Sequence, residues 1–228
     1  MVLAALVWVS LAAGCACPGR VGPSVPVAET RQGLSLRGTP RWAMAARDAV
    51  LAFPEAAGTF SCAVNAPITE QETPHLYMLL LKTRNDVVTA TGKAKEYYRR
   101  SRPFAANGEP SCTPDAEKDL AANGSYPSGH TAIGWAWALV LSEVAPERAD
   151  AVLARGRAFG ESRMVCNVHW GSDVAEWRVV GAATVARLHA DPVFRADMEA
   201  ARAELAAVRA KGFGPQLDCA AEAAAMRK

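Results

Sequence analysis

The chain has 228 residues, which is enough for one domain of ordinary size with a substantial hydrophobic core. Half of its residues are hydrophobic and 21% are charged, a composition typical of a folded globular protein and not of a disordered one. Its 25 Lys and Arg against 23 Asp and Glu leave a net charge of only +2, so the balance excludes a general nucleic-acid-binding surface, and no nucleic-acid partner is expected.

The N-terminal segment, residues 1–17, contains no charged side chain and is followed by Pro18 and Gly19. It is just shorter than the run of about 18 apolar residues that predicts a transmembrane helix. Its apolar core and its small residues at the end are typical of a secretory signal peptide. Leu11 to Cys15 also matches a lipobox, in which Cys15 would carry a lipid anchor. Both signals usually have a Lys or Arg before the apolar run, which is missing here, and a buried N-terminal helix is the alternative.

We therefore expect a signal peptide or a lipoprotein signal over 1–17 and a periplasmic or secreted protein, with a membrane-anchored lipoprotein as the open alternative. Outside this segment four cysteines remain, namely Cys62, Cys112, Cys166 and Cys219. In an oxidising compartment they predict two disulfides, in one of three pairings between which the sequence does not decide. Four buried free thiols are the alternative. No CxxC pair is present, so a zinc-finger site is not expected.

The predicted elements are all helices. In chain order they span 42–53, 74–100 as one helix or two, a turn within 115–122, then 129–144, 147–163, 171–189 and 192–210. Each rests on apolar residues at helical spacing or on a Pro at its boundary, as at Pro54 and Pro103. The strongly apolar segment 129–144 is interrupted by Glu143 before it reaches the length of a bilayer span, so we expect a buried core helix.

No segment keeps the alternation of polar and apolar residues that marks a strand. The sequence therefore predicts an all-α fold, a compact helical bundle in one domain over residues 42–210. Residues 18–41 are rich in Pro, Gly, Ser and Thr and are expected to form an N-terminal tail. We expect loops over 55–68 and 104–126, and a C-terminal tail over 211–228 with little order except around Cys219.

Three separated segments gather the residues that carry chemistry, and the first is Lys95-x6-Arg102-Pro103. On a helix, Lys95 and Arg102 are seven residues apart and share a face. Pro103 disfavours helical geometry at Arg102, which places that guanidinium at the end of the helix. Two fixed cations suit a phosphate group, and an Arg can bind two of its oxygens. A solvated basic face is the alternative for this segment on its own.

The second segment, Pro127-Ser128-Gly129-His130, comes directly before the apolar helix. Ser128 is a favoured N-cap residue, so the first backbone N–H groups of the helix form an anion site beyond it. Gly129 lets an oxyanion approach the backbone closely. His130 is a candidate proton donor at that site. An ordinary capped turn is the alternative.

The third segment is Ser162-Arg163-x5-His169-x3-Asp173. If a helix begins near residue 170, the Asp173 carboxylate can reach back to the His169 imidazole, orient the ring and stabilise its charged form. Arg163 adds a third cation. A helix-start histidine with an aspartate in the first turn is the alternative. Together the three segments supply cations, a helix N-terminus, a nucleophile and an acid, which is what phosphoryl transfer requires.

The patterns Lys-x6-Arg-Pro, Pro-Ser-Gly-His and Ser-Arg-x5-His-x3-Asp resemble the signature of the PAP2 phosphatase superfamily, and all eleven positions are present in order. That superfamily includes acid phosphatases, membrane lipid phosphatases and vanadium haloperoxidases. The octapeptide GSYPSGHT at 124–131 is similar to that of the bacterial class A non-specific acid phosphatases in particular. The resemblance covers about 42–208, and the segment before it is shorter than is usual in that family.

The resemblance implies a helical core of the PAP2 or haloperoxidase type and a metal-independent phosphomonoesterase that requires no cofactor. It implies that His169 is the nucleophile and forms a phosphohistidine, that Asp173 holds it, and that His130 protonates the leaving alcohol. The residues implied to bind the phosphate oxygens are Lys95, Arg102, Ser128, Gly129 and Arg163. The expected substrates are small-molecule phosphomonoesters of broad range, and phosphate or vanadate is the expected ligand or inhibitor of the site.

Three other functions are weighed against this one. A lipid phosphatase and a vanadate-dependent haloperoxidase would use the same site, although the chain has no series of membrane spans and is small for a haloperoxidase. A non-catalytic periplasmic phosphate-binding lipoprotein would need a broken catalytic position, and none is broken. A lipid anchor at Cys15, assembly into a homo-oligomer and the physiological ester are left open by the sequence.

Several residues near the motifs lie outside the signature. We expect His75 and His189 at helix ends, and we expect Arg99 and Arg100 to be solvent-facing or paired. The aromatic residues divide into two groups by position. Trp135 and Trp137 are expected in the core, while Tyr126 and Trp170 adjoin signature residues and are expected to wall the pocket.

Overall fold

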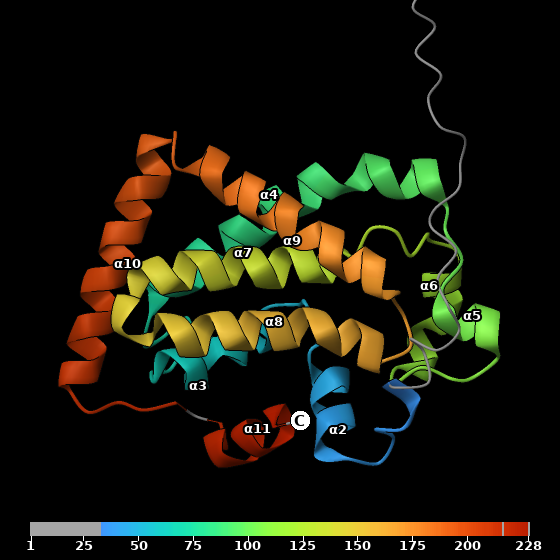
Figure 1. Cartoon of the computed structure of the whole chain (residues 1–228). Coiled ribbons are helices and arrows are strands. Elements are labelled where there is room, and N and C mark those ends of the chain that lie inside the picture. The colour runs from blue at the N-terminus through green and yellow to red at the C-terminus, as the bar shows by residue number, and fades with distance from the viewer. Residues whose placement is uncertain (1–32, 216, 228) are drawn as a thin grey trace, which may run out of the picture.

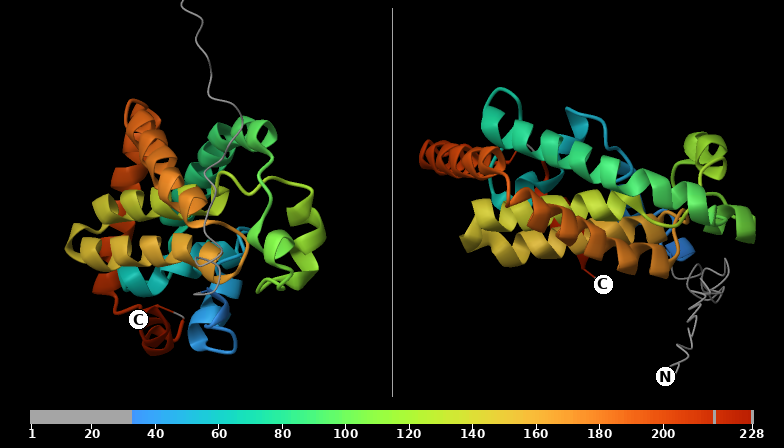
Figure 2. Two further views of the ribbon diagram at one scale, coloured as in Figure 1. Left: turned by 45° about the vertical axis from the view of Figure 1, so that its right-hand side comes forward. Right: turned by 90° about the horizontal axis from the view of Figure 1, so that it is seen from above.

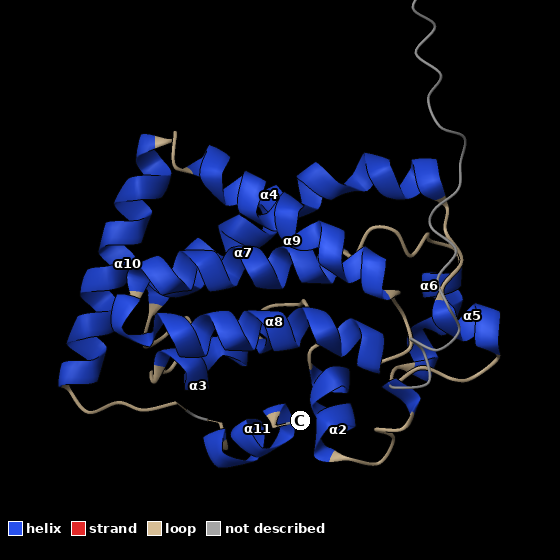
Figure 3. Ribbon diagram, in the orientation of Figure 1, coloured by secondary structure: helices blue, strands red, loops and turns tan. Residues whose placement is uncertain are grey.

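The structure is a computed structural model that describes residues 33–215 and 217–227, and it shows a bundle of helices (Figure 1). Figure 3 shows helices joined by loops, with no strand in the described part of the chain, which confirms the predicted all-α class. The predicted signal over 1–17, with Cys15 and Cys17, lies outside the described residues, as does most of the predicted tail over 18–41. No helix in the described ranges is both long and apolar enough to cross a membrane.

The described helices, in chain order, are α2 (Pro40–Arg47), α3 (Ser61–Val64), α4 (Pro74–Tyr98), α5 (Pro103–Asn107), α6 (Glu117–Ala121), α7 (Gly129–Val144), α8 (Ala149–Val165), α9 (Gly171–Leu188), α10 (Pro192–Ala210) and α11 (Cys219–Met226), with 3₁₀ turns over Glu55–Phe60, Pro114–Ala116 and Pro146–Arg148. Many begin at a Pro, whose fixed φ suits the first helical position and whose missing N–H costs nothing there. Ser128 caps α7 by accepting a hydrogen bond from the Thr131 N–H.

The long helices agree with the predicted ones to within two residues, and the segment 74–100 is one helix. Two expectations were wrong. The helix predicted over 42–53 spans Pro40–Arg47 instead, because after Asp48 the N–H groups of Ala49 and Val50 bond to carbonyls three residues back, which form turns and not an α-helix. The loops predicted over 55–68 and 104–126 contain α3 and α5, which are too short to show an apolar period in the sequence.

Helix α7 is the centre of the core and packs against α8, α9, α4 and α10. Its side chains Ile133, Trp137 and Leu141 are fully buried, as the apolar run predicts. The indole N–H of Trp137 donates to the Leu80 carbonyl of α4 at 2.9 Å, which satisfies the polar atom of that buried ring. At Gly181 of α9 a Cβ atom would collide with the α7 backbone, so the absence of a side chain lets these two helices approach closely.

The arrangement of the long helices brings the three motifs to one end of the bundle. In Figure 1 the C-terminal ends of α4 and α8 and the N-terminal ends of α7 and α9 all lie toward the right, beside α5 and α6. Figure 2 shows α10 across the opposite end and α4 running alongside the other long helices. The residues that precede α7 and α9 and those that follow α4 therefore face a common region.

The four cysteines in the described part of the chain form two disulfides, Cys62–Cys219 and Cys112–Cys166, which confirms the expectation of two. The first joins residues 157 apart in the sequence and ties α11 to α3. Helix α11 also packs against α2. The helix thus forms around Cys219, the part of residues 211–228 for which order was expected.

Candidate active site

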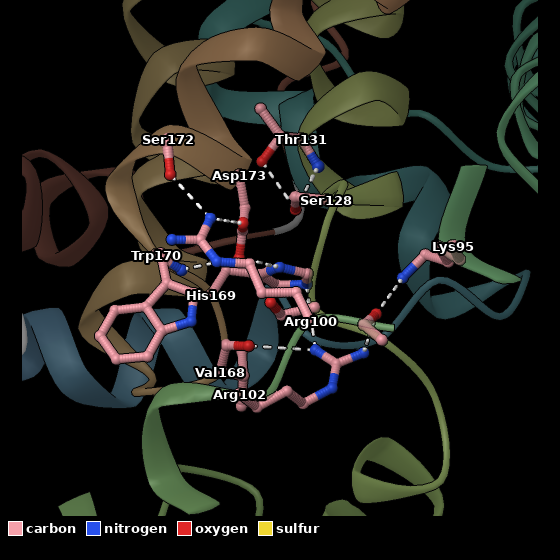
Figure 4. Close-up of polar contacts among 12 residues, drawn as sticks. Lys95, Arg100, Arg102, Ser128, Thr131, Val168, His169, Trp170, Ser172 and Asp173 are labelled. Carbon is pink, nitrogen blue, oxygen red and sulfur yellow. Dashed lines mark hydrogen bonds and ion pairs between the residues drawn. The ribbon is translucent and has the colours of Figure 1, made fainter. Parts of the chain in front are cut away.

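His169 lies between α8 and α9 and is only 4% exposed (Figure 4). Its Nδ1 atom is 3.3 Å from Oδ2 of Asp173, and its Nε2 atom is 3.2 Å from Nη1 of Arg102. Because an ionised carboxylate only accepts and a guanidinium only donates, Nδ1 carries the proton and Nε2 presents its lone pair. Burial, followed by the positive charges of Arg102 and Arg163, lowers the pKa of His169 well below its ordinary value. The ring is thus held neutral, with the lone pair of Nε2 directed toward Arg102.

Asp173 is fully buried in the first turn of α9, and its carboxylate has several partners. Besides His169, the Trp170 N–H donates to Oδ2 at 2.9 Å, and Nη1 of Arg100 donates to Oδ1 at 2.6 Å. Burial raises the pKa of Asp173, while the Trp170 N–H and the Arg100 charge oppose that rise. Arg100 also donates to the Ser172 hydroxyl at 2.8 Å, so this guanidinium fixes the start of α9 (Figure 4).

Arg100 is the site residue that the sequence motifs missed. Of the two alternatives expected for it, the ion pair is the one that the structure shows. The reason is the position of the helix end, which the sequence does not mark: helix α4 ends at Tyr98, and the chain is non-helical from residue 99 to Arg102. In an extended segment, residues two apart point to the same side. Arg100 therefore contacts Asp173 while Arg102 contacts its neighbour His169.

Lys95 and Arg102 lie together at the site. The prediction that they share a helix face was wrong. Lys95 lies in the last turn of α4, whereas Arg102 follows the end of that helix and precedes α5. Both donate to the Gly124 carbonyl, each at 3.3 Å. A Cβ atom on Gly124 would come within 3.1 Å of the Lys95 carbonyl oxygen, so the missing side chain allows this approach.

Arg102 also fixes the loops on either side of it. Its Nε donates to the Leu120 carbonyl at 2.6 Å, and its Nη1 donates to the Val168 carbonyl at 3.0 Å. Burial lowers the pKa of Arg102 to about 10, and burial together with the nearby Arg102 charge lowers the pKa of Lys95 to about 8. Both groups remain cationic at neutral and acid pH.

Arg163, in the last turn of α8, is 1% exposed. Within the described ranges, its Nε and Nη1 atoms have no hydrogen-bond partner. Burial and the charge of Arg102 lower its pKa to about 9. A buried guanidinium with unpaired N–H groups is costly unless an anion binds to it, so Arg163 is suited to bind one.

The N-terminal end of α7 completes the region. The Ser128 hydroxyl oxygen accepts from the Thr131 N–H at 3.3 Å and from the Thr131 hydroxyl at 2.9 Å, and the Ser128 N–H donates to the Asp173 carbonyl at 3.3 Å. A Cβ atom built on Gly129 would meet no heavy atom within 4 Å beyond its chain neighbours and its own helix backbone. The space beside the Gly129 backbone is therefore open.

His130 follows Gly129 on α7 and is half-buried. Its Nε2 atom lies 2.9 Å from the carbonyl oxygen of Ala49, which follows α2. A carbonyl only accepts, so Nε2 carries a proton and Nδ1 is the nitrogen left to exchange one. Burial and then the charge of Arg163 lower the pKa of His130 well below its ordinary value.

The Cys112–Cys166 disulfide braces the loop that carries His169. Cys166 is fully buried, and the Cys112 N–H donates to its carbonyl at 3.2 Å. The next residue, Asn167, has a left-handed backbone with φ of 60°. Its side chain donates to the Glu109 carbonyl at 2.7 Å, which joins this loop to the segment after α5.

Aromatic residues lie beside these groups. The Trp170 indole N–H donates to the Ser101 carbonyl at 2.8 Å, and the Arg100 guanidinium lies 5.6 Å from the centroid of that ring (Figure 4). Tyr126 packs edge-on against Tyr98 with 4.8 Å between ring centroids. Trp137 is buried as expected and Trp135 is partly buried against the same core.

The two remaining histidines lie at helix ends, as expected. His189 is the C-cap of α9 and pairs with Glu143 at 3.0 Å, and His75 lies in the first turn of α4, where Glu204 accepts from its backbone N–H. In the part of the chain that the structure describes, no group of three or more His, Cys, Asp or Glu side chains is arranged to hold a metal ion.

Comparison with known proteins identifies the family. The model of the PAP2 superfamily matches residues 74–196, which include all three motifs. The chain is 46% identical over 179 residues to a non-specific acid phosphatase of Providencia stuartii, covering 78% of this chain and 72% of the relative. It is 45% identical over 176 residues to a non-specific acid phosphatase of Salmonella typhimurium, covering 76% and 70%.

A third relative, an acid phosphatase of Zymomonas mobilis, is 40% identical over 186 residues, which is 82% of this chain and 69% of the relative. The family match contains all the residues that the structure gathers around His169, from Lys95 to Asp173. The chain therefore belongs to the PAP2 superfamily and stands among its bacterial non-specific acid phosphatases.

Proposed function

We propose that the protein is a metal-independent acid phosphatase that hydrolyses a broad range of phosphate monoesters through a phosphohistidine at His169. The observation that carries the proposal is the orientation of that imidazole, with Nδ1 facing Asp173 at 3.3 Å and Nε2 beside Arg102 at 3.2 Å. The lone pair is thus directed at a cationic region. The acid phosphatase names of the relatives support the same activity.

The phosphate oxygens would be bound by Lys95, Arg102, Arg163, the Ser128 hydroxyl and the Gly129 N–H. Arg163 supports this assignment most directly, since it is 1% exposed and keeps two nitrogen atoms without partners in the described chain. Cations and N–H donors fixed before the substrate binds stabilise the charge on the equatorial oxygens of the transition state. No metal ion is needed for that purpose.

In the first step, Nε2 of His169 attacks phosphorus and the bond from phosphorus to the ester oxygen breaks. His130 transfers the proton from its Nδ1 atom to the leaving oxygen, so that an alcohol and not an alkoxide departs. The imidazole of His169 becomes cationic as the P–N bond forms. The ionised carboxylate of Asp173, which accepts from Nδ1–H of that ring, stabilises the charge.

In the second step, water attacks the phosphorus of the phosphohistidine. Neutral His130 accepts the proton of the water, the P–N bond breaks, and inorganic phosphate leaves. His169 returns to its neutral form and His130 is again protonated. Each turnover therefore consumes one water and releases one alcohol and one phosphate.

The pKa directions predict activity at acid pH. The pKa of His169 lies well below its ordinary value, so its lone pair is still present in mildly acid solution. The pKa of His130 is lowered as well, so its acidic form is present only at low pH and is lost as the pH rises. The rate should therefore fall on the alkaline side as His130 deprotonates and on the acid side as His169 gains a proton.

The direct test is hydrolysis of p-nitrophenyl phosphate at acid pH in the presence of EDTA. We expect full activity with EDTA, competitive inhibition by phosphate and vanadate, and loss of turnover in His169→Ala on the order of 10⁴-fold or more. Inactivation by EDTA that added metal reverses would contradict metal independence. Turnover near that of the unchanged protein in His169→Ala would contradict the nucleophile.

We also propose that the protein works outside the cytoplasm, in the periplasm or as a secreted protein. The two disulfides, Cys62–Cys219 and Cys112–Cys166, support this location because such bonds persist in oxidising compartments. A mass measurement on the mature chain tests it. A cleaved N-terminus supports export, added lipid mass identifies Cys15 as an anchor, and an intact N-terminus with reduced cysteines would contradict export.

A further inference from the structure

Asp48 lies just after α2, outside every motif of the signature, and is only 2% exposed. Its carboxylate accepts from both ends of the Arg155 guanidinium, at 2.5 Å from Nη2 and 3.2 Å from Nη1. The Ser162 hydroxyl donates to Oδ2 at 2.6 Å. A buried carboxylate with this many charged and hydroxyl donors is held in one position.

Both partners of Asp48 lie on α8, the helix that also carries Arg163. Ser162 precedes Arg163 within the third motif, but its hydroxyl is engaged away from the phosphate-binding groups. It lies 2.6 Å from Asp48, and it accepts from Nη1 of Arg41 at 2.9 Å. The contacts of Ser162 therefore join α8 to α2 and leave the phosphate to its neighbour Arg163.

The residue after Asp48 contacts the proposed general acid. The Ala49 carbonyl lies 2.9 Å from Nε2 of His130. Because the carbonyl accepts, it keeps the proton on Nε2 and orients the ring so that Nδ1 exchanges its proton with the leaving oxygen. The position of this carbonyl depends on the end of α2, and the Asp48 side chain fixes that end to α8.

We propose that Asp48 is a positioning residue for proton transfer by His130, acting through the adjacent Ala49 carbonyl. This inference rests on the proposed function. It assigns to Asp48 an effect on the transfer of the proton to the leaving group. Nucleophilic attack by His169 uses the α8–α9 connection, and of the proposed phosphate-binding groups only Arg163 lies on the helix that Asp48 contacts. A disturbance of Arg163 would affect all phosphate esters alike, so a comparison of substrates separates it from an effect on His130.

The substitution Asp48→Asn can test this role without removing the fold's other contacts. Asn keeps the size of the side chain and one acceptor oxygen, and Arg155 keeps Glu222, which lies 3.2 Å from its Nε. Helix α2 keeps its buried Met44 and the bond from Arg41 to the Ala158 carbonyl at 3.0 Å. The end of the helix near Ala49 is the part that loses its ionic anchor.

The measurement is kcat/KM for two substrates that differ in their need for an acid. 2,4-Dinitrophenyl phosphate releases a stable phenolate and needs no proton, whereas glycerol phosphate releases an alkoxide unless it is protonated. General acids contribute about 10²–10⁴-fold to such steps. We expect Asp48→Asn to lower kcat/KM for glycerol phosphate by about 10- to 100-fold and for the dinitrophenyl ester by less than about 3-fold, a partial loss of that contribution.

Three controls separate positioning from stability. Glu222→Gln weakens the ion pair between Arg155 and residue 222. We expect a lower unfolding temperature and an unchanged ratio of kcat/KM between the two substrates. Ser162→Ala removes one hydrogen bond to Asp48, and we expect the same selective loss at smaller size. In a His130→Ala background, Asp48→Asn should cause no further selective loss, because the group that it positions is absent.

Equal losses on both substrates in Asp48→Asn would overturn the proposal, as would a selective loss that persists in the His130→Ala background. If Asp48→Asn does not fold, Ser162→Ala decides by the same comparison of substrates. Absence of hydrolysis of both esters by the unchanged protein would instead contradict the proposed function, so the two failures are distinguishable.

Discussion

Arg100 donates to Oδ1 of Asp173 at 2.6 Å, on the carboxylate oxygen opposite to the one that faces His169. The carboxylate is fully buried, and a buried negative charge is unfavourable unless a partner compensates it. Arg100 therefore keeps Asp173 ionised while the other oxygen remains available to the imidazole. The pair links the segment after α4 to the first turn of α9 and holds the carboxylate that faces His169.

Replacement of Arg100 should weaken catalysis without touching the phosphate. In Arg100→Gln the pKa of Asp173 should rise further, because a positive charge that lowers it is removed. The ionised carboxylate would then be lost at a higher pH as the solution is acidified. We expect kcat to fall by about 10- to 100-fold and the acid limb of the pH profile to move to higher pH.

The pH dependence of kcat for Arg100→Gln checks this prediction, with Arg187→Gln, an exposed substitution on α9, as the matched control. A uniform decrease at every pH, with the acid limb in its original place, would show that Arg100 acts only on the fold.

The open backbone at the start of α7 gives a second prediction. In Gly129→Ala the added methyl group meets no packed neighbour, so the helix should be as stable as before or slightly more stable, since Ala favours helix by up to about 1 kcal/mol over Gly. The same methyl group would occupy the space through which a phosphate oxygen reaches the Gly129 N–H. We expect the inhibition constant of phosphate to rise about 10-fold, a loss of roughly one charge-assisted hydrogen bond.

Thermal unfolding and phosphate inhibition of Gly129→Ala, measured on the same preparation, check this pair of expectations. Unchanged inhibition with unchanged stability would mean that phosphate does not bind at this N-terminus.

Lys95 should limit phosphate binding at alkaline pH. Its pKa is lowered to about 8 by burial and by the Arg102 charge, so its cationic form is present below that pH and is lost as the pH rises through it. The affinity for phosphate should therefore decrease above about pH 8. In Lys95→Met we expect weaker binding at every pH and a smaller decrease between pH 7 and 9, to which Arg163, with its pKa lowered to about 9, still contributes. Titration of phosphate inhibition against pH measures both, and an identical alkaline limb in the two proteins would assign it to another group.

The two disulfides should differ in their effect on activity. Removing either by a double Cys→Ser substitution should cost about 2–4 kcal/mol of the free energy of unfolding. Only the loss of Cys112–Cys166 should also lower kcat, because Cys166 is three residues from His169 and the bond braces that loop. Loss of Cys62–Cys219 releases α11, which packs against α2 and carries none of the proposed site residues. Denaturant unfolding and kcat/KM on both variants check the difference, and equal effects on kcat would contradict it.

The sequence predicted those parts of the site that depend on local geometry. The Ser128 cap and the four-residue spacing from His169 to Asp173 are set by the first turn of a helix, so they can be read from the chain. The shared helix face of Lys95 and Arg102 was wrong because α4 ends at Tyr98, where Arg99 adopts a left-handed conformation without a glycine to signal it.

The contacts between distant segments could not be predicted from one chain. The Ala49–His130 and Arg155–Asp48 contacts join residues 81 and 107 apart. Periodicity shows which face of a helix is buried but not which loop or helix end meets it. The pairing of the cysteines and the helix around Cys219 depend on the same unknown, the packing of one element on another.

The central claim is that His169 accepts the phosphoryl group. The most direct measurement uses His130→Ala with 2,4-dinitrophenyl phosphate, because this substrate phosphorylates the enzyme without an acid while the second step lacks its base. After an alkaline quench, which preserves phosphohistidine, mass spectrometry of the peptides should find the phosphoryl group on His169. Turnover of the substrate with His169 unmodified, or with the phosphoryl group on another residue, would contradict the account.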